Sequence, residues 1–188
     1  MTNQQPPVPV RASGYAAAAW CLGYAGVSAW QLAAGPPGRY ASGLAIMIVL
    51  VGLLKLAGAA VALAAVLVRP GRPRRPPQLL GVALWGAFGL LSLYSAGNLA
   101  ITVGTVSGLL APSAAWIAAH GVTARALGYV LFFLLGAALF GVLAVWFHRR
   151  HHLGWTAVVA GLAGAPLLLA LILAVAPAIL GRWGLLPA

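Results

Sequence analysis

The 188-residue chain contains no aspartate and no glutamate. Hard cations such as Ca²⁺ and Mg²⁺ are held by carboxylate oxygens, and hydrolysis by paired carboxylates or acid-assisted triads also needs these groups. Proton and cation pathways through membranes use Asp, Glu or His. The absence of acidic residues therefore excludes carboxylate-based hydrolysis. It also disfavours a calcium or magnesium site and a proton-coupled cation transporter.

Charge of either sign is scarce, because 6% of the residues are charged and 63% are hydrophobic. Soluble domains carry about 25% charged residues, so the composition excludes a soluble or disordered protein. A net charge of +11 suggests nucleic acid in a soluble protein. Here the arginines flank apolar runs, where membrane topology and anionic headgroups account for them. We predict a multi-pass protein of the cell membrane that binds no nucleic acid.

Cysteine and histidine are also few. Cys21 is the sole cysteine and lies inside an apolar run, so we interpret it as a small buried hydrophobe. No histidine falls at mid-depth of a span, where an intramembrane bis-histidine haem would need it. His148 with His151 or His152 has a spacing compatible with metal, but the neighbouring arginines repel a cation. We therefore expect no metal and no cofactor.

Apolar runs long enough to cross the ~30 Å hydrocarbon core recur along the chain. They predict an all-α, polytopic membrane helix bundle with a single transmembrane domain over 13–182. Polar, proline-rich residues 1–12 indicate a disordered cytoplasmic tail, and 183–188 form a short tail. The five expected transmembrane helices are about 14–34, 43–68, 80–104, 126–147 and 153–180.

The first span has a second interpretation, a cleaved signal peptide, because small residues follow it. Trp20, Tyr24, Trp30 and Gln31 make this segment bulkier and more polar than the apolar region of a signal peptide. We therefore favour a retained helix.

The basic residues are unevenly distributed between the two sides of the predicted bundle. Basic residues in short loops mark the cytoplasmic side, which places the N-terminus inside and the C-terminus outside. Anionic lipid headgroups are the expected partners of Arg69, Arg72, Arg74, Arg75, Arg149 and Arg150, which share that side with Arg11; Arg39, Arg125 and Arg182 lie opposite.

Lys55 stands at the midpoint of the span 43–68. At ~1.5 Å per residue it lies roughly 15 Å from either membrane surface, too deep for its stem to reach water fully. The chain offers it no carboxylate. It shares a helical stripe with Gly52, Gly58 and Ala62, and small residues on such a stripe are typical of close helix contact. We therefore expect Lys55 to point into the bundle.

Polar residues of two other spans are candidates to surround Lys55. Ser95, Asn98 and Thr102 form a stripe on the third span, and Tyr24 lies at mid-depth of the first. We predict a polar, partly wet cluster of Lys55, Tyr24, Ser95 and Asn98, a putative binding site. The alternative is that the stripe only makes interhelical hydrogen bonds worth ~0.6–2 kcal/mol each.

Four segments carry a resemblance to a known family. They are Leu54–Ala59, Val68–Pro70 with the following proline-arginine loop, Leu93–Leu99, and Gly136–Arg150 with its Trp-Phe-His-Arg-Arg ending. In these segments the chain resembles a family of small actinobacterial multispan membrane proteins known only as a domain of unknown function. The resemblance implies a multispan bundle with the lysine and the Tyr/Asn helix as its common feature, and it implies no activity.

No catalytic constellation is visible, so we expect a protein that is not an enzyme. The leading hypothesis is a non-enzymatic membrane module, either accessory to a membrane-protein partner or self-associating as a homo-oligomer. The alternative is a conduit or carrier for an anion or small polar solute, with Lys55 as its internal site. A third hypothesis is a covalent site at Lys55, such as a Schiff base.

Overall fold

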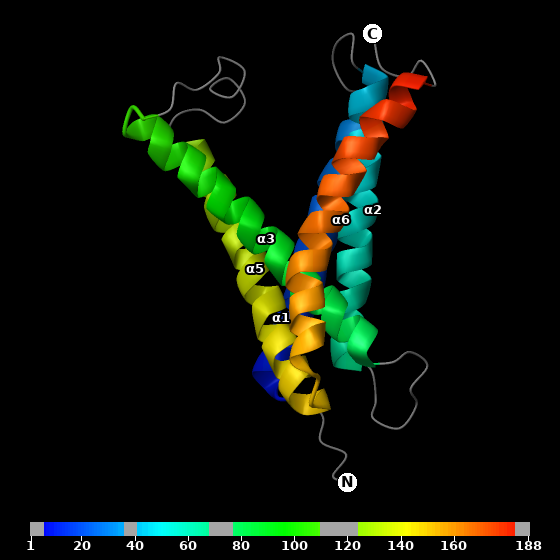
Figure 1. Cartoon of the computed structure of the whole chain (residues 1–188), viewed down its shortest axis with the longest axis vertical. Coiled ribbons are helices and arrows are strands. Elements are labelled where there is room, and N and C mark those ends of the chain that lie inside the picture. Colours follow the sequence, from blue (N-terminus) through cyan, green and yellow to red (C-terminus); the bar gives the residue numbers. More distant parts are fainter. Residues whose placement is uncertain (1–5, 36–40, 68–76, 110–123, 183–188) are drawn as a thin grey trace.

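The computed structural model describes residues 6–35, 41–67, 77–109 and 124–182. All regular secondary structure in these ranges is α-helical, which confirms the all-α part of the predicted fold class. The helices are α1 (Val8–Ala33), α2 (Ala41–Leu67), α3 (Pro77–Val106), α5 (Ala124–His151) and α6 (Trp155–Arg182) (Figure 1).

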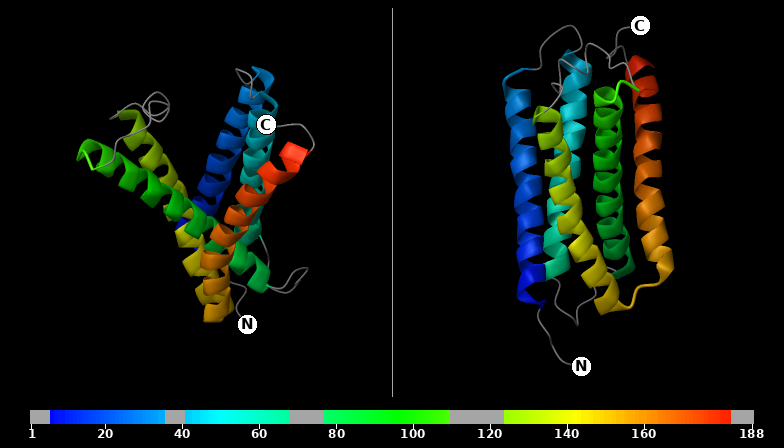
Figure 2. Two further views of the ribbon diagram at one scale, coloured as in Figure 1. Left: turned by 45° about the horizontal axis from the view of Figure 1, so that its top comes forward. Right: turned by 90° about the vertical axis from the view of Figure 1, so that its left-hand side faces the viewer.

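Three stretches of the described chain are long and apolar enough to cross a membrane. They are Ala45–Leu67 in α2, Pro77–Val106 in α3 and Leu127–His151 in α5. A shorter apolar stretch, Trp155–Leu167, begins α6. The helices run along the length of the molecule as a bundle (Figure 2).

The first helix starts earlier than the predicted span 14–34. It begins at Val8, with Pro7 as its N-cap and Pro9 in its first turn. Proline is tolerated there, because the first amides of a helix have no intrahelical acceptor and the fixed φ of proline suits the helix. The predicted tail is therefore wrong over Val8–Ala12, which are helical. Residues 1–5 of that tail lie outside the described residues.

The fourth predicted span, 126–147, is also longer in the structure. The helix α5 continues through the basic segment and ends at His151, and the next residue, His152, has a positive φ of 46°. The backbone N–H of Leu153 then donates to the carbonyl of His148 at 3.2 Å. Basic side chains in the last turn suit the partial negative charge at a helix C-terminus.

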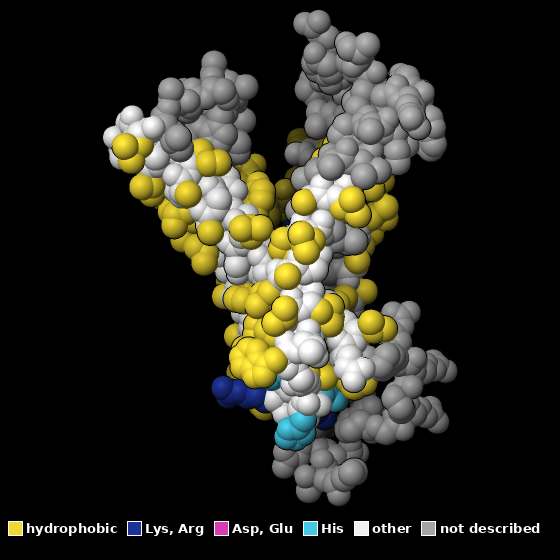
Figure 3. Space-filling model, in the orientation of Figure 1, with side chains coloured by type: hydrophobic (Ala, Val, Ile, Leu, Met, Phe, Trp, Pro, Cys, Tyr) yellow, Lys and Arg dark blue, Asp and Glu magenta, His cyan; other side chains and the backbone are white. Residues whose placement is uncertain are grey.

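The end of the bundle that holds the start of α1 and the end of α5 is called here the basic end, because Arg11, Arg149 and Arg150 lie there. Figure 3 shows Lys, Arg and His side chains gathered at this end. The buried core occupies the half of the bundle next to the basic end. Its members there include Ala17, Ala18, Cys21, Ala59, Ala62, Ala65, Leu84, Phe140, Leu143, Ala144 and Phe147.

Toward the opposite end, called here the open end, the helices separate. The outer halves of α3 and α5 lean away from α1, α2 and α6, so that the molecule forms two arms (Figures 1 and 2). Gly97 and Gly128 lie in these outer halves and Gly26 lies in the outer half of α1, and a Cβ built on any of the three meets nothing within 4 Å. The space-filling view shows a V-shaped notch between the two arms (Figure 3).

In the packed half, the backbones of α3 and α6 approach closely at Gly161. A Cβ added to Gly161 would lie 2.7 Å from the carbonyl oxygen of Val82 and 2.5 Å from the Cβ of Trp85. Neither atom can move without moving the backbone of α3. Gly161 is therefore required for the contact between these two helices, as small residues commonly are between membrane helices.

We expect Gly161→Ala to lower the free energy of unfolding by about 1–3 kcal/mol, because overpacking forces the helices apart. Gly164→Ala is the matched control on the same helix, since its added Cβ meets nothing within 4 Å. The control should be neutral or stabilising by up to about 1 kcal/mol through helix propensity. Unfolding in mixed micelles with rising SDS, followed by circular dichroism, measures both. Equal stability of the two variants would contradict the close α3–α6 contact.

Candidate functional site at Lys55

The Lys55 side chain extends from α2 toward α1 and α5, into the bundle as expected. Its Nζ lies 4.5 Å from the ring centroid of Trp20, 4.9 Å from that of Tyr24 and 5.2 Å from that of Phe133. These three rings are called here the aromatic cage. The face of an aromatic ring attracts a cation within about 6 Å of its centroid. The chain has no Asp or Glu to pair with Lys55, and the aromatic cage instead provides a favourable electrostatic environment for an ammonium.

The geometry of the cage follows from its helices. Trp20 and Tyr24 are four residues apart on α1 and so lie on one face, with their planes 15° apart and their centroids at 6.3 Å. Phe133 comes from α5 and is buried. It meets Trp20 edge-on at 5.9 Å and Tyr24 at the same distance. Closing the cage therefore requires α1, α2 and α5 to be packed together.

Further aromatic rings extend the cage toward α3 and along α5. Tyr94 of α3 lies 4.4 Å from Phe133, centroid to centroid, and Phe132 lies 4.9 Å from Trp20. Tyr129 stacks with Phe133 at 6.5 Å, with planes 12° apart. Aromatic pairs of this kind contribute about 0.5–1.5 kcal/mol each beyond the area they bury. These aromatic contacts join α1, α3 and α5 at the depth of Lys55.

The four residues of the predicted polar cluster are not joined by hydrogen bonds in the described part of the chain. Tyr24 does lie beside Lys55, through the face of its ring. Ser95 is buried and its hydroxyl donates to the carbonyl of Leu91 at 2.8 Å. The Asn98 amide donates to the carbonyl of Tyr94 at 2.8 Å. Both polar groups thus bond four residues back on their own helix, a common way to satisfy them in an apolar environment.

Sequence reasoning missed Trp20 and Phe133, which make two of the three rings around Lys55. Tryptophans of membrane proteins are expected at the interface, and Phe133 was one apolar residue among many. A usable signal was present: Trp20 lies one helical turn from Tyr24 and six residues inside the predicted span 14–34, rather than at its end.

The cage lies where the two arms part. On its basic side the core is buried, and on its other side the helices diverge (Figure 1). The Lys55 side chain is only partly buried, and Tyr94 is 46% exposed. Tyr129 and Phe132 are exposed as well. The cage and these rings therefore form the floor of the notch.

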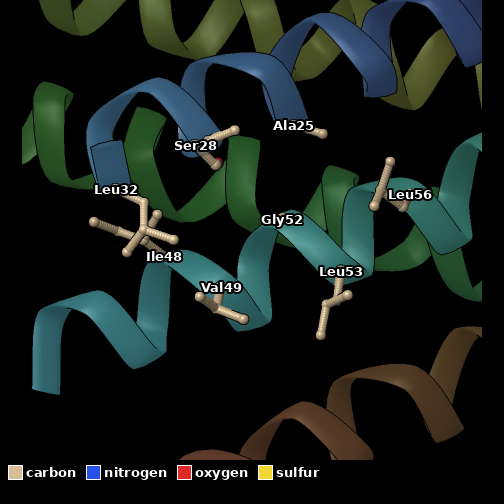
Figure 4. A pocket seen from close by; sticks show the side chains of 9 residues that line it. Ala25, Ser28, Leu32, Ile48, Val49, Gly52, Leu53 and Leu56 are labelled. Carbon is tan, nitrogen blue, oxygen red and sulfur yellow. The ribbon is translucent and has the colours of Figure 1, made fainter. Parts of the chain in front are cut away.

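A separate shallow groove of about 170 Å³ lies between α1 and α2 (Figure 4). Its lining is apolar apart from Ser28, whose hydroxyl donates to the carbonyl of Tyr24 at 3.2 Å. Gly52 and Leu56 line it from α2, while Lys55 does not. Because it offers no unpaired polar group, this groove adds no chemistry to the site.

The side chains of the basic end pack as expected near a membrane interface. The guanidinium carbon of Arg150 lies 4.9 Å from the ring centroid of Trp146. His148 packs between Trp85 and Trp155, with centroids at 6.3 and 6.1 Å. Tryptophan and arginine together are typical of the headgroup region.

Taken together, the long apolar helices and the lysine held between them define a helical membrane protein. No family model, no curated protein and no solved structure matches the chain. The resemblance to the actinobacterial family therefore stays a prediction.

A double-mutant cycle tests the interaction between Lys55 and Trp20. We expect Lys55→Met and Trp20→Leu to be coupled by about 0.5–2 kcal/mol in the free energy of unfolding, the range of partly desolvated cation–π pairs. Trp30→Leu is the control, because Trp30 is on the same helix but 70% exposed. Its coupling to Lys55→Met should be near zero. Additive effects in both cycles would show that the cage does not stabilise the lysine.

Proposed function

We propose that the chain is a non-enzymatic module of the cell membrane that works by associating with other membrane helices. The observation that carries this proposal is the separation of the arms at the open end. It leaves helix surfaces in the apolar part of the bundle without a partner inside the described chain. Exposed apolar side chains there include Leu53 of α2, Leu99 and Val103 of α3, and Leu127 and Leu131 of α5. Large exposed apolar surfaces mark protein–protein or membrane interaction sites.

The proposed topology has five spans, with the N-terminus in the cytoplasm and the C-terminus outside. It is supported by the opposite ends of the bundle at which α1 begins and α6 ends (Figure 1). The gathering of Arg11, Arg149 and Arg150 at the basic end also supports it. We propose that Arg149 and Arg150 contact anionic headgroups there. The loop with Arg69, Arg72, Arg74 and Arg75 lies outside the described residues.

Reporter fusions in a bacterial host test this topology. Green fluorescent protein fused before Met1 should fluoresce, because it folds in the cytoplasm. Alkaline phosphatase fused after Arg182 should be active, because it needs the oxidising outer side. Activity of alkaline phosphatase at the N-terminus instead would reverse the proposed orientation.

Site-specific photocrosslinking tests the association itself. A photoreactive amino acid at Leu131, which is 66% exposed in the outer half of α5, should give a discrete adduct in native membranes. The adduct should contain either a second copy or another membrane protein. The same residue placed at Leu143, which is fully buried, is the matched control and should give none. If only monomer is recovered from Leu131, the module does not associate through this surface.

A second candidate function is a conduit or carrier for an anion or small polar solute. It is favoured by one feature, the position of Lys55 at the floor of a notch that also exposes Tyr94 and Tyr129. Cationic and hydroxyl side chains in an apolar pore favour anions. We expect liposomes with this protein to pass halide or small carboxylates only weakly. A flux that is lost in Lys55→Met but kept in Lys55→Arg would establish the conduit, and a flux unchanged in Lys55→Met would exclude it.

A further inference from the structure

The cage has hydrogen-bond donors that no acceptor among the described residues uses. A lysine ammonium has three N–H donors, and within the described chain Nζ contacts rings but donates no hydrogen bond. The indole Nε1 of Trp20, in the same cage, is buried and also has no partner among the described residues. Aromatic faces attract a cation but do not replace a strong acceptor. A carboxylate is the acceptor that pairs most strongly with an ammonium.

A second copy of the chain cannot supply that carboxylate. The chain has eleven Lys and Arg residues and no Asp or Glu, so no helix of a second copy would bring a side-chain carboxylate to Lys55. The acceptor must therefore come from a different molecule.

The depth of Lys55 in the bundle restricts which kind of molecule can bring a carboxylate to it. Lys55 is fourteen residues from the start of α2 at Ala41 and twelve from its end at Leu67, that is, ~18–21 Å from either end. Lipid headgroups and the carboxylate of a free fatty acid lie at the membrane surface, beyond the reach of this side chain. A transmembrane helix can carry a carboxylate at mid-depth, where such groups are found paired with a partner.

The walls of the notch suit a helix. Gly128 precedes Phe132 by one helical turn on α5, and Phe132 packs on Trp20 and Tyr24 of α1. Gly128 therefore faces the space between α5 and α1, and nothing lies within 4 Å of a Cβ built on it. Gly97 follows Tyr94 by three residues on α3, and a Cβ built on Gly97 also meets nothing within 4 Å. Gly97 and Gly128 belong to the two helices of one arm, and small residues such as these let a third helix backbone approach closely.

From these observations we infer that the notch binds a transmembrane helix of another protein, and that an Asp or Glu near the midpoint of that helix pairs with Lys55. This inference rests on the proposed association function and names its partner class. The apolar remainder of the partner helix covers the exposed side chains of the two arms, and its carboxylate accepts hydrogen bonds from Lys55 Nζ.

The test uses the full chain in phosphatidylcholine vesicles with two model peptides. Both are leucine-rich transmembrane helices, one with a single central Glu and the other with Gln at the same position. Energy transfer between labelled protein and labelled peptide gives the two affinities. We expect the Glu peptide to bind at least about tenfold more tightly, a preference of ~1.4 kcal/mol. The preference should vanish in Lys55→Met and persist in Lys55→Arg.

A second variant keeps the inference testable if Lys55→Met does not fold. Gly128→Leu leaves the cage residues unchanged and places a side chain in the notch, so it should weaken binding of both peptides. Equal binding of the Glu and Gln peptides to the unaltered chain would overturn the inference, as would unchanged binding to Gly128→Leu. If photocrosslinking at Leu131 still gives an adduct, either result contradicts only the inference about the carboxylate-bearing helix and not the proposed association. The failure of the inference can therefore be distinguished from the failure of the proposed function.

Discussion

The structure depends on how one lysine is held inside an apolar bundle without a counter-ion. Three rings, those of Trp20, Tyr24 and Phe133, surround Lys55 Nζ at 4.5–5.2 Å from their centroids. A cation–π contact is stronger when the cation is removed from water, which is the situation in the middle of a membrane protein. The contact also couples three helices, because the lysine belongs to α2, two rings to α1 and one to α5. Loss of α1 or α5 would remove one or two of the rings that surround the lysine.

The cage also marks a boundary in the packing. On the basic side, small and aromatic residues pack the helices closely, and Gly161 meets the backbone of α3 with no room for a Cβ. On the other side, a Cβ built on Gly97 or Gly128 would meet nothing within 4 Å, and the arms diverge (Figure 2). The packed half gives the fold its stability, while the open half leaves surface free for other molecules. The protein thus combines a closed core with an unfilled notch, and the charged residue lies between the two.

Much of the fold was predictable from the sequence. Membrane helices can be recognised in a sequence by their length and hydrophobicity, because the thickness and apolar character of the bilayer impose both. The helix bounds agree with the predicted spans to within a few residues, except at the first helix, where the prolines at 7 and 9 predict a tail and the structure has a helix from Val8. That error has a physical cause, since proline breaks a helix in its interior but is well tolerated in the first turn. The direction of Lys55 into the bundle was also predicted, from the small residues that share its face.

The sequence by itself determined that the chain is helical and apolar, that a lysine lies at mid-depth and that no carboxylate of its own can pair with it. Composition and hydropathy suffice for these statements because they concern single segments. Only the tertiary structure decided what meets the lysine. The predicted partners Ser95 and Asn98 bond to their own helix, and the rings that surround Nζ come from residues 113 positions apart in the chain, Trp20 and Phe133. Which faces of α1, α2 and α5 meet depends on the packing of all the helices at once, and no local pattern encodes it.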